Sequence, residues 1–264
     1  MTTLDPRTRT SDPAPTRTSA PATPATDPAY RIGAVALVAG CLLMATGGVL
    51  DATSGANFFA TMTESDPAAM TAGLVAADAA RNQIVTGFAL WIAGVPTISV
   101  GVTLLSRRTI ASAWSGVARW AAGASTGAAI VFFSAMLGIV VGLAPAAAAG
   151  DDVVAVTRAL GTAAVTADWV VTTLVMAGSI GSLVLSARGR WAPRWLVGLA
   201  ITTYVVSAVS LLAYVVGADD LTMLIVPVGF TLGLSTGVIA FRSTGASPSA
   251  TIDGSTPIDV RGRA

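Results

Sequence analysis

Histidine and lysine are both absent from this chain of 264 residues, and cysteine occurs once. Without histidine, the chain lacks the side chain that most often serves as a general base or a metal ligand. The single cysteine, Cys41, can form neither an intramolecular disulfide nor a cysteine metal cluster. These absences argue against an enzyme, and the sequence predicts no catalytic residue, no metal site and no cofactor.

Charge is also scarce, since 11% of the residues are charged and 53% are hydrophobic. The apolar residues fall in blocks of about 20, the length that a helix needs to cross the hydrocarbon core of a bilayer. We therefore expect an all-α fold, a polytopic transmembrane bundle of six helices with the lipid bilayer as its main partner. The predicted spans are residues 32–50, 84–105, 120–143, 169–187, 195–216 and 221–241.

Two polar segments flank this membrane domain, which covers residues 30–242. Residues 1–29 and 243–264 are rich in Thr, Ser, Pro and Ala or Gly and carry few large apolar side chains. Such segments cannot bury enough apolar surface to offset the entropy lost on ordering. We expect both to be disordered cytoplasmic tails.

The arginines sort sharply between alternate loops. Thirteen of the fifteen lie in the two tails, beside them at Arg31 and Arg242, or in the loops after the second and fourth predicted spans. The opposite side has only Arg81 and Arg158, against nine acidic residues. Because basic residues near helix ends are retained in the cytoplasm, this asymmetry predicts an N-in, C-in protein. All 15 basic residues are arginine and Ala, Val, Gly and Thr are abundant, which is typical of a GC-rich bacterial genome, so the expected location is a bacterial inner membrane.

Two acidic residues on the outer side resemble helix caps. Asp66 precedes Pro67, a pair typical of a helix start, so a short interfacial helix is expected from Pro67. Asp151 is expected to cap the fourth helix, which would then extend out of the membrane through Arg158.

Glycines at helical spacing predict close helix packing, because small residues allow helix backbones to approach each other in a bilayer. The first two spans place glycine at seven-residue intervals, at Gly33, Gly40 and Gly47 and at Gly87, Gly94 and Gly101. Packing glycines are also expected in the third span at Gly123, Gly127, Gly138 and Gly142, and in the sixth at Gly229, Gly233 and Gly237. A glycine face left free would allow a homo-oligomer, and we expect that face on the sixth helix.

Several polar or irregular positions could instead mark a solute path. Pro96 and Pro227 are candidate helix breaks, which line the binding site in many transporters. Asp51, Arg81, Arg158 and Asp168 are candidates for an outer ionic cluster that binds or gates a cation; alternatively, they are solvated charges at helix ends. A transporter would have a wet cavity between the second, fourth and sixth helices.

Motifs for other functions are missing or misplaced. Gly123–Gly127 and Gly233–Gly237 both match the G-x-S-x-G pattern of hydrolases, but each lies inside an apolar helix of a chain without histidine. Phosphate-binding loops and basic aromatic surfaces are absent, so no nucleic-acid partner is expected.

Short segments are similar to one known family. The stretch from Arg190 to Leu196, RWAPRWL, resembles the loop-to-helix signature of a bacterial six-helix membrane family classified as a domain of unknown function. Tyr30–Gly33, Asn82–Ile84 and Arg119 resemble that family's entries to the first three helices, whereas the end of the sixth helix lacks the expected acidic residue. The resemblance implies six helices and no established activity.

Three functions remain in view, one of them a membrane sensor or enzyme, although the sequence supplies few polar groups that could converge within the bilayer. The first is a structural, accessory or partner-binding membrane protein, because spanning, orientation and packing account for most of the informative residues. The alternative is a small transporter or channel for an ion or small solute.

Overall fold

The computed structural model describes residues 27–56, 58–107, 109, 111–216 and 224–243. The predicted tails lie outside this part of the chain except at their inner ends, where residues 28–29 belong to the first helix and Ser243 to the last. The regular elements of the described residues are helices, with one isolated bridge between Arg188 and Ala192.

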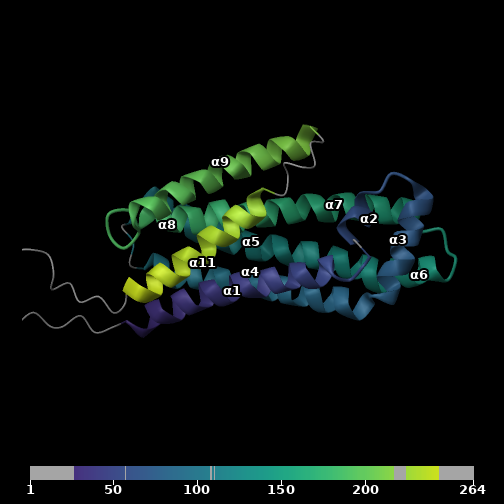
Figure 1. Cartoon of the computed structure of the whole chain (residues 1–264), viewed down its shortest axis with the longest axis horizontal. Helices are drawn as coiled ribbons and strands as arrows, with labels where there is room; N and C mark the ends of the chain where they lie inside the picture. The colour runs from purple at the N-terminus through teal and green to yellow at the C-terminus, as the bar shows by residue number, and fades with distance from the viewer. Residues whose placement is uncertain (1–26, 57, 108, 110, 217–223, 244–264) are drawn as a thin grey trace, which may run out of the picture.

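Six helical segments are long and apolar enough to cross a membrane (Figure 1). They are α1 (Pro28–Ala52), α4 (Arg81–Ser106), the continuous run of α5 (Ala113–Leu137), η1 (Gly138–Leu143) and α6 (Ala144–Ala148), the continuous run of α7 (Val154–Thr173), η2 (Leu174–Gly181) and α8 (Ser182–Ser186), α9 (Arg194–Val216) and α11 (Ile225–Ser243). The predicted all-α bundle of six spans is confirmed. The predicted start of the sixth helix, residue 221, lies outside the described residues.

Several helices begin earlier or end later than the hydropathy pattern predicts. Their cap residues and terminal turns contain polar side chains, which a hydropathy criterion leaves out of the span. Asp27 caps α1 by accepting a hydrogen bond from the Ala29 amide at 3.1 Å, so the helix begins at Pro28, four residues before the predicted span. Asp66 caps α3 (Pro67–Ala79) in the same way, as predicted. At the start of α7, Asp152 rather than Asp151 accepts from the Val154 amide.

The two ends of the described chain meet. The hydroxyl groups of Tyr30 in α1 and Ser243 in α11 lie 3.5 Å apart, and Figure 1 shows both ends at the same end of the bundle. At the other end, α3 and the short α2 (Phe58–Thr63), which hydropathy does not predict, pack against α6 and the start of α7. The six spans therefore leave the start of α1 and the end of α11 at one end of the bundle.

The two longest helical runs give the bundle a second core. The α5–η1–α6 run has 36 residues and the α7–η2–α8 run has 33, so both exceed the roughly 20 residues that a bilayer requires. Their extra turns surround Met62, Met70 and Leu74 from α2 and α3, which are fully buried. A separate core lies among the spans themselves, around Leu37, Ile98 and Ile180.

The α7–η2–α8 run is the central helix of the bundle. In its most apolar stretch of 18 residues, 72% is buried inside the protein, against 33–39% in the corresponding stretches of the other five spans. Large apolar side chains of the outer helices face away from the protein, as expected in lipid; Trp120, Val131, Leu212 and Val215 are examples.

Glycines hold α1 and α4 backbone to backbone, which confirms the close packing predicted for these two helices. A Cβ atom added at Gly94 would lie 2.7 Å from the carbonyl oxygen of Gly40, and one at Gly101 would lie 2.9 Å from that of Gly33. Such distances are shorter than any Cβ contact that real side chains make. A side chain at either position would force the two helices apart.

The glycines of α11 also pack inside the bundle. Gly229 faces Met176, Gly233 faces the Cys41 sulfur, and Gly237 faces Val38. The prediction that this helix carries the free glycine face is therefore wrong.

The free face belongs to α5 and η1 instead. Gly123, Gly127, Gly138 and Gly142 are exposed, and a Cβ at any of them would have no neighbour within 4 Å. They were predicted to pack, but α5 packs through the opposite face, where Ser99 of α4 donates a hydrogen bond to the Ala122 carbonyl at 2.7 Å. Alanine and serine are small enough for this contact, and they leave the glycines facing outward.

The two prolines differ in position. Pro96 lies in the middle of α4, which continues unbroken to Ser106. Pro227 is the third residue of α11, within the first turn, where a backbone N–H has no partner inside the helix in any case. Pro227 is therefore not a break within the described helix.

Candidate functional site

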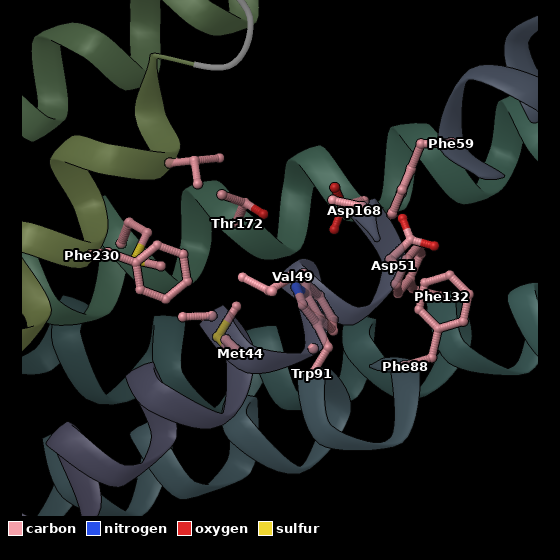
Figure 2. Close-up of a pocket in the computed structure, with 16 residues that line it drawn as sticks. Met44, Val49, Asp51, Phe59, Phe88, Trp91, Phe132, Asp168, Thr172 and Phe230 are labelled. Carbon is pink, nitrogen blue, oxygen red and sulfur yellow. The ribbon is translucent and has the colours of Figure 1, made fainter. Parts of the chain in front are cut away.

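A cavity of about 570 Å³ lies between α1 and α7 at the junction of the two cores (Figure 2). α4 and α5 contribute Phe88, Trp91 and Phe132, α2 contributes Phe59, and α11 closes one end with Val226 and Phe230. This volume is within the range of small-molecule sites in proteins. The cavity expected for a transporter, between the second, fourth and sixth spans, is thus found mainly between the first and fourth.

Asp51 reaches the cavity from the last turn of α1. The inward face of α1 runs through Met44 and Gly47, and Asp51 continues this face four residues after Gly47. Its side chain is 8% exposed, and its Oδ1 atom has no hydrogen-bond partner in the described part of the chain. A buried polar atom without a partner is uncommon in native proteins and calls for an explanation.

Asp168 faces Asp51 from α7. It shares one helix face with Thr172 and Met176, which follow it at intervals of four residues and also line the cavity. Figure 2 shows the two carboxyl groups near each other at the cavity on two different helices, and they are close enough to interact electrostatically. Neither forms an ion pair within the residues that the structure covers.

Five aromatic rings line the cavity together with small and aliphatic residues of α1. Phe132 is their centre: its ring centroid is 5.1 Å from that of Trp91, 6.2 Å from that of Phe88 and 6.4 Å from that of Phe59. Phe230 approaches from the α11 side. The cavity is therefore an apolar, aromatic chamber with two acidic groups and the Thr172 hydroxyl, and its described lining contains no basic residue.

The two outer arginines lie elsewhere. Arg81 forms an ion pair with Asp78, and Arg158 donates a hydrogen bond to the Ser65 carbonyl at 2.9 Å. The predicted cluster of four charged residues is corrected to a pair of carboxyl groups. The arginines instead fasten the α2–α3 segment to the spans, because Arg158 joins α7 to the loop before α3 and Arg81 joins the ends of α3 and α4.

A π-helical segment adjoins the site. η2 begins after Thr173, and Met176 within it lines the cavity and packs against Gly229 of α11. π-turns inside α-helices are rare and are frequent at functional sites. A π-helix has more residues per turn than an α-helix, so η2 shifts the directions in which the side chains after Thr172 point into the bundle.

Sequence reasoning identified the two carboxyl groups and missed the aromatic wall. Phe88 and Trp91 lie three residues apart and so share one face of α4, which was a readable signal. Nothing in the sequence indicates that Phe132 from α5 and Phe59 from the unpredicted α2 join them.

Other chemistry is not assembled. The described residues contain no group of three or more His, Cys, Asp or Glu side chains that could hold a metal ion. Both G-x-S-x-G matches lie within helices, α5 and α11, as expected. Comparison of the chain with protein-family models, with curated proteins and with solved structures finds no match. The resemblance to a six-helix family of unknown activity stays a prediction.

Proposed function

We propose that this multi-pass membrane protein binds a small solute inside its helix bundle, as a small transporter or channel of a bacterial inner membrane does. The observation that supports this most strongly is Asp51, a buried carboxyl group whose Oδ1 has no described partner and which faces Asp168 across a 570 Å³ cavity. The cost of a carboxylate in a membrane rises toward about 3 kcal/mol at the bilayer centre. An occupant that contacts the carboxyl groups would offset this cost.

The distribution of arginine supports an orientation for the site. Arg31 in α1 and Arg242 in α11 lie at the end of the bundle where Tyr30 and Ser243 meet. The positive-inside rule then makes both termini cytoplasmic. The cavity, at the opposite ends of α1 and α11, would face the outer leaflet.

An accessory, partner-binding role is the second candidate, because α5 and η1 expose a face of glycines. Gly123, Gly127, Gly138 and Gly142 would admit the backbone of another transmembrane helix, from a second copy or from a different membrane protein. A partner-binding role leaves the carboxyl pair of the cavity without a function. Solute binding gives the pair a function and is therefore the favoured proposal.

Thiol labelling tests whether the cavity admits solutes from water. Gly48→Cys, in a Cys41→Ser background, places a thiol on the cavity wall, where a Cβ meets no atom within 4 Å. Ser134→Cys is the matched control, because Ser134 is exposed on α5 two residues beyond the cavity residue Phe132.

We expect a membrane-impermeant methanethiosulfonate reagent to modify Gly48→Cys in intact membranes much faster than Ser134→Cys. Equal, slow modification of both would mean a dry cavity and would refute the proposed solute site.

A further inference from the structure

We propose that the solute is a bulky organic monocation, a quaternary ammonium or protonated amine with apolar substituents, held between the Asp51–Asp168 pair and the aromatic wall. This inference rests on the proposed function and names the chemical class of its ligand.

The charge of the cavity selects the sign of the ligand. Asp51 and Asp168 are the charged side chains in the described lining, and the two arginines predicted to join them, Arg81 and Arg158, bind other partners. An anion would meet two acidic groups without a compensating donor of positive charge. A cation would balance the negative charge of Asp51, whose Oδ1 has no hydrogen-bond partner in the described structure.

The size and lining of the cavity suit a small metal ion less well than a larger organic cation. Calcium takes six to eight oxygen ligands and magnesium requires octahedral coordination, whereas the lining offers two carboxyl groups and one threonine hydroxyl as side-chain oxygens. Most of the 570 Å³ would remain unfilled and apolar around a bare ion.

The aromatic rings favour a cation that carries its own apolar surface. Phe, Tyr and Trp attract cations through the negative faces of their rings, and quaternary ammonium groups are bound in this way in aromatic cages. Figure 2 shows Phe59 and Phe132 beside Asp51, and Trp91 and Phe230 farther along the cavity. One end of the chamber can therefore neutralise the charge while the rest covers the apolar substituents.

A pair of ions with the same shape and opposite charge provides the test. We would measure saturable binding of tetraphenylphosphonium and of tetraphenylborate to the full chain in nanodiscs, with empty nanodiscs as background. Benzyltrimethylammonium would serve as a smaller competitor. The variants are Asp51→Asn and Asp168→Asn, with Asp78→Asn as the control because Asp78 pairs with Arg81 outside the cavity.

We expect tetraphenylphosphonium to bind saturably, to compete with benzyltrimethylammonium and to protect Gly48→Cys from labelling. Asp51→Asn and Asp168→Asn should each weaken its binding by roughly tenfold or more, and Asp78→Asn should leave it unchanged. Each variant's elution profile and melting temperature would establish that it is folded.

Two outcomes would overturn the cation assignment: equal saturable binding of tetraphenylborate, or no saturable binding of either cation. If Gly48→Cys is nevertheless labelled from water, the cavity still admits solutes, and the proposed function survives without this ligand class. If Gly48→Cys is not labelled either, both proposals fail.

Discussion

Asp51 and Asp168 are placed by the same helical periodicity that places their packing neighbours. Gly47 contacts α4, and Asp51 follows it on the inward face of α1. Asp168 precedes Thr172 and Met176 on the face of α7 that lines the cavity. Alone, Asp51 would be an ordinary residue at a helix end and Asp168 a single acidic residue within a long helical run. Together, in an aromatic chamber, they form a site of negative charge within an apolar protein.

Protons should compete with a bound cation at this pair. Protonation removes the negative charge of a carboxyl group, so the affinity for tetraphenylphosphonium should fall as the pH is lowered. The Asp51→Asn/Asp168→Asn double variant should show weak binding that does not change with pH, because the described cavity lining has no other titratable group. Binding isotherms over a pH series measure this; a pH response retained in the double variant would place the titrating group outside the cavity.

At the scale of the elements, the helix pairs differ in how their small residues are used. α1 and α4 approach through glycine, α4 and α5 through alanine and the Ser99 hydroxyl, and α11 fits its glycines over Met176, Cys41 and Val38. The glycines of α5 take no part in these contacts. Small residues therefore indicate that a helix can pack closely without indicating which face it uses.

Two substitutions separate a packing glycine from an exposed one. Gly94→Ala adds a Cβ 2.7 Å from the Gly40 carbonyl oxygen, so α1 and α4 must separate, and we expect a loss of about 1–3 kcal/mol in stability. Gly127→Ala meets no atom within 4 Å and replaces glycine with a better helix former, so stability should hold or rise slightly. Unfolding of both variants in detergent by a denaturant measures the difference. A Gly94→Ala protein as stable as the parent would contradict the close contact of these helices.

At the scale of the whole molecule, the bundle has two unlike ends. One carries both ends of the described chain, linked at Tyr30 and Ser243. The other carries α2, α3 and α6 with a core of their own, and Arg158 ties this segment to α7. The cavity lies where that second core meets the spans, so the α2–α3 segment forms part of its wall through Phe59.

The orientation of the molecule can be tested with reporter fusions. A fluorescent protein that folds only in the cytoplasm, fused after Ala264, should be bright, and alkaline phosphatase at the same position should be inactive. Phosphatase inserted between Glu64 and Ser65, in the loop before α3, should be active. The reverse pattern of reporter activity would mean that the cavity faces the cytoplasm.

The sequence by itself determined the number of spans, the all-α class, the helix start at Pro67 and the two acidic residues of the site. Hydropathy, capping residues and charge are local properties, and a bilayer imposes a fixed length on each apolar segment. Only the tertiary structure decided which face each helix turns inward, because the rotation of a helix about its axis depends on its neighbours. That rotation exposed Gly123 and Gly127, buried Gly233, separated Arg81 and Arg158 from the acids, and brought Phe59, Phe88 and Phe132 from three helices to one cavity.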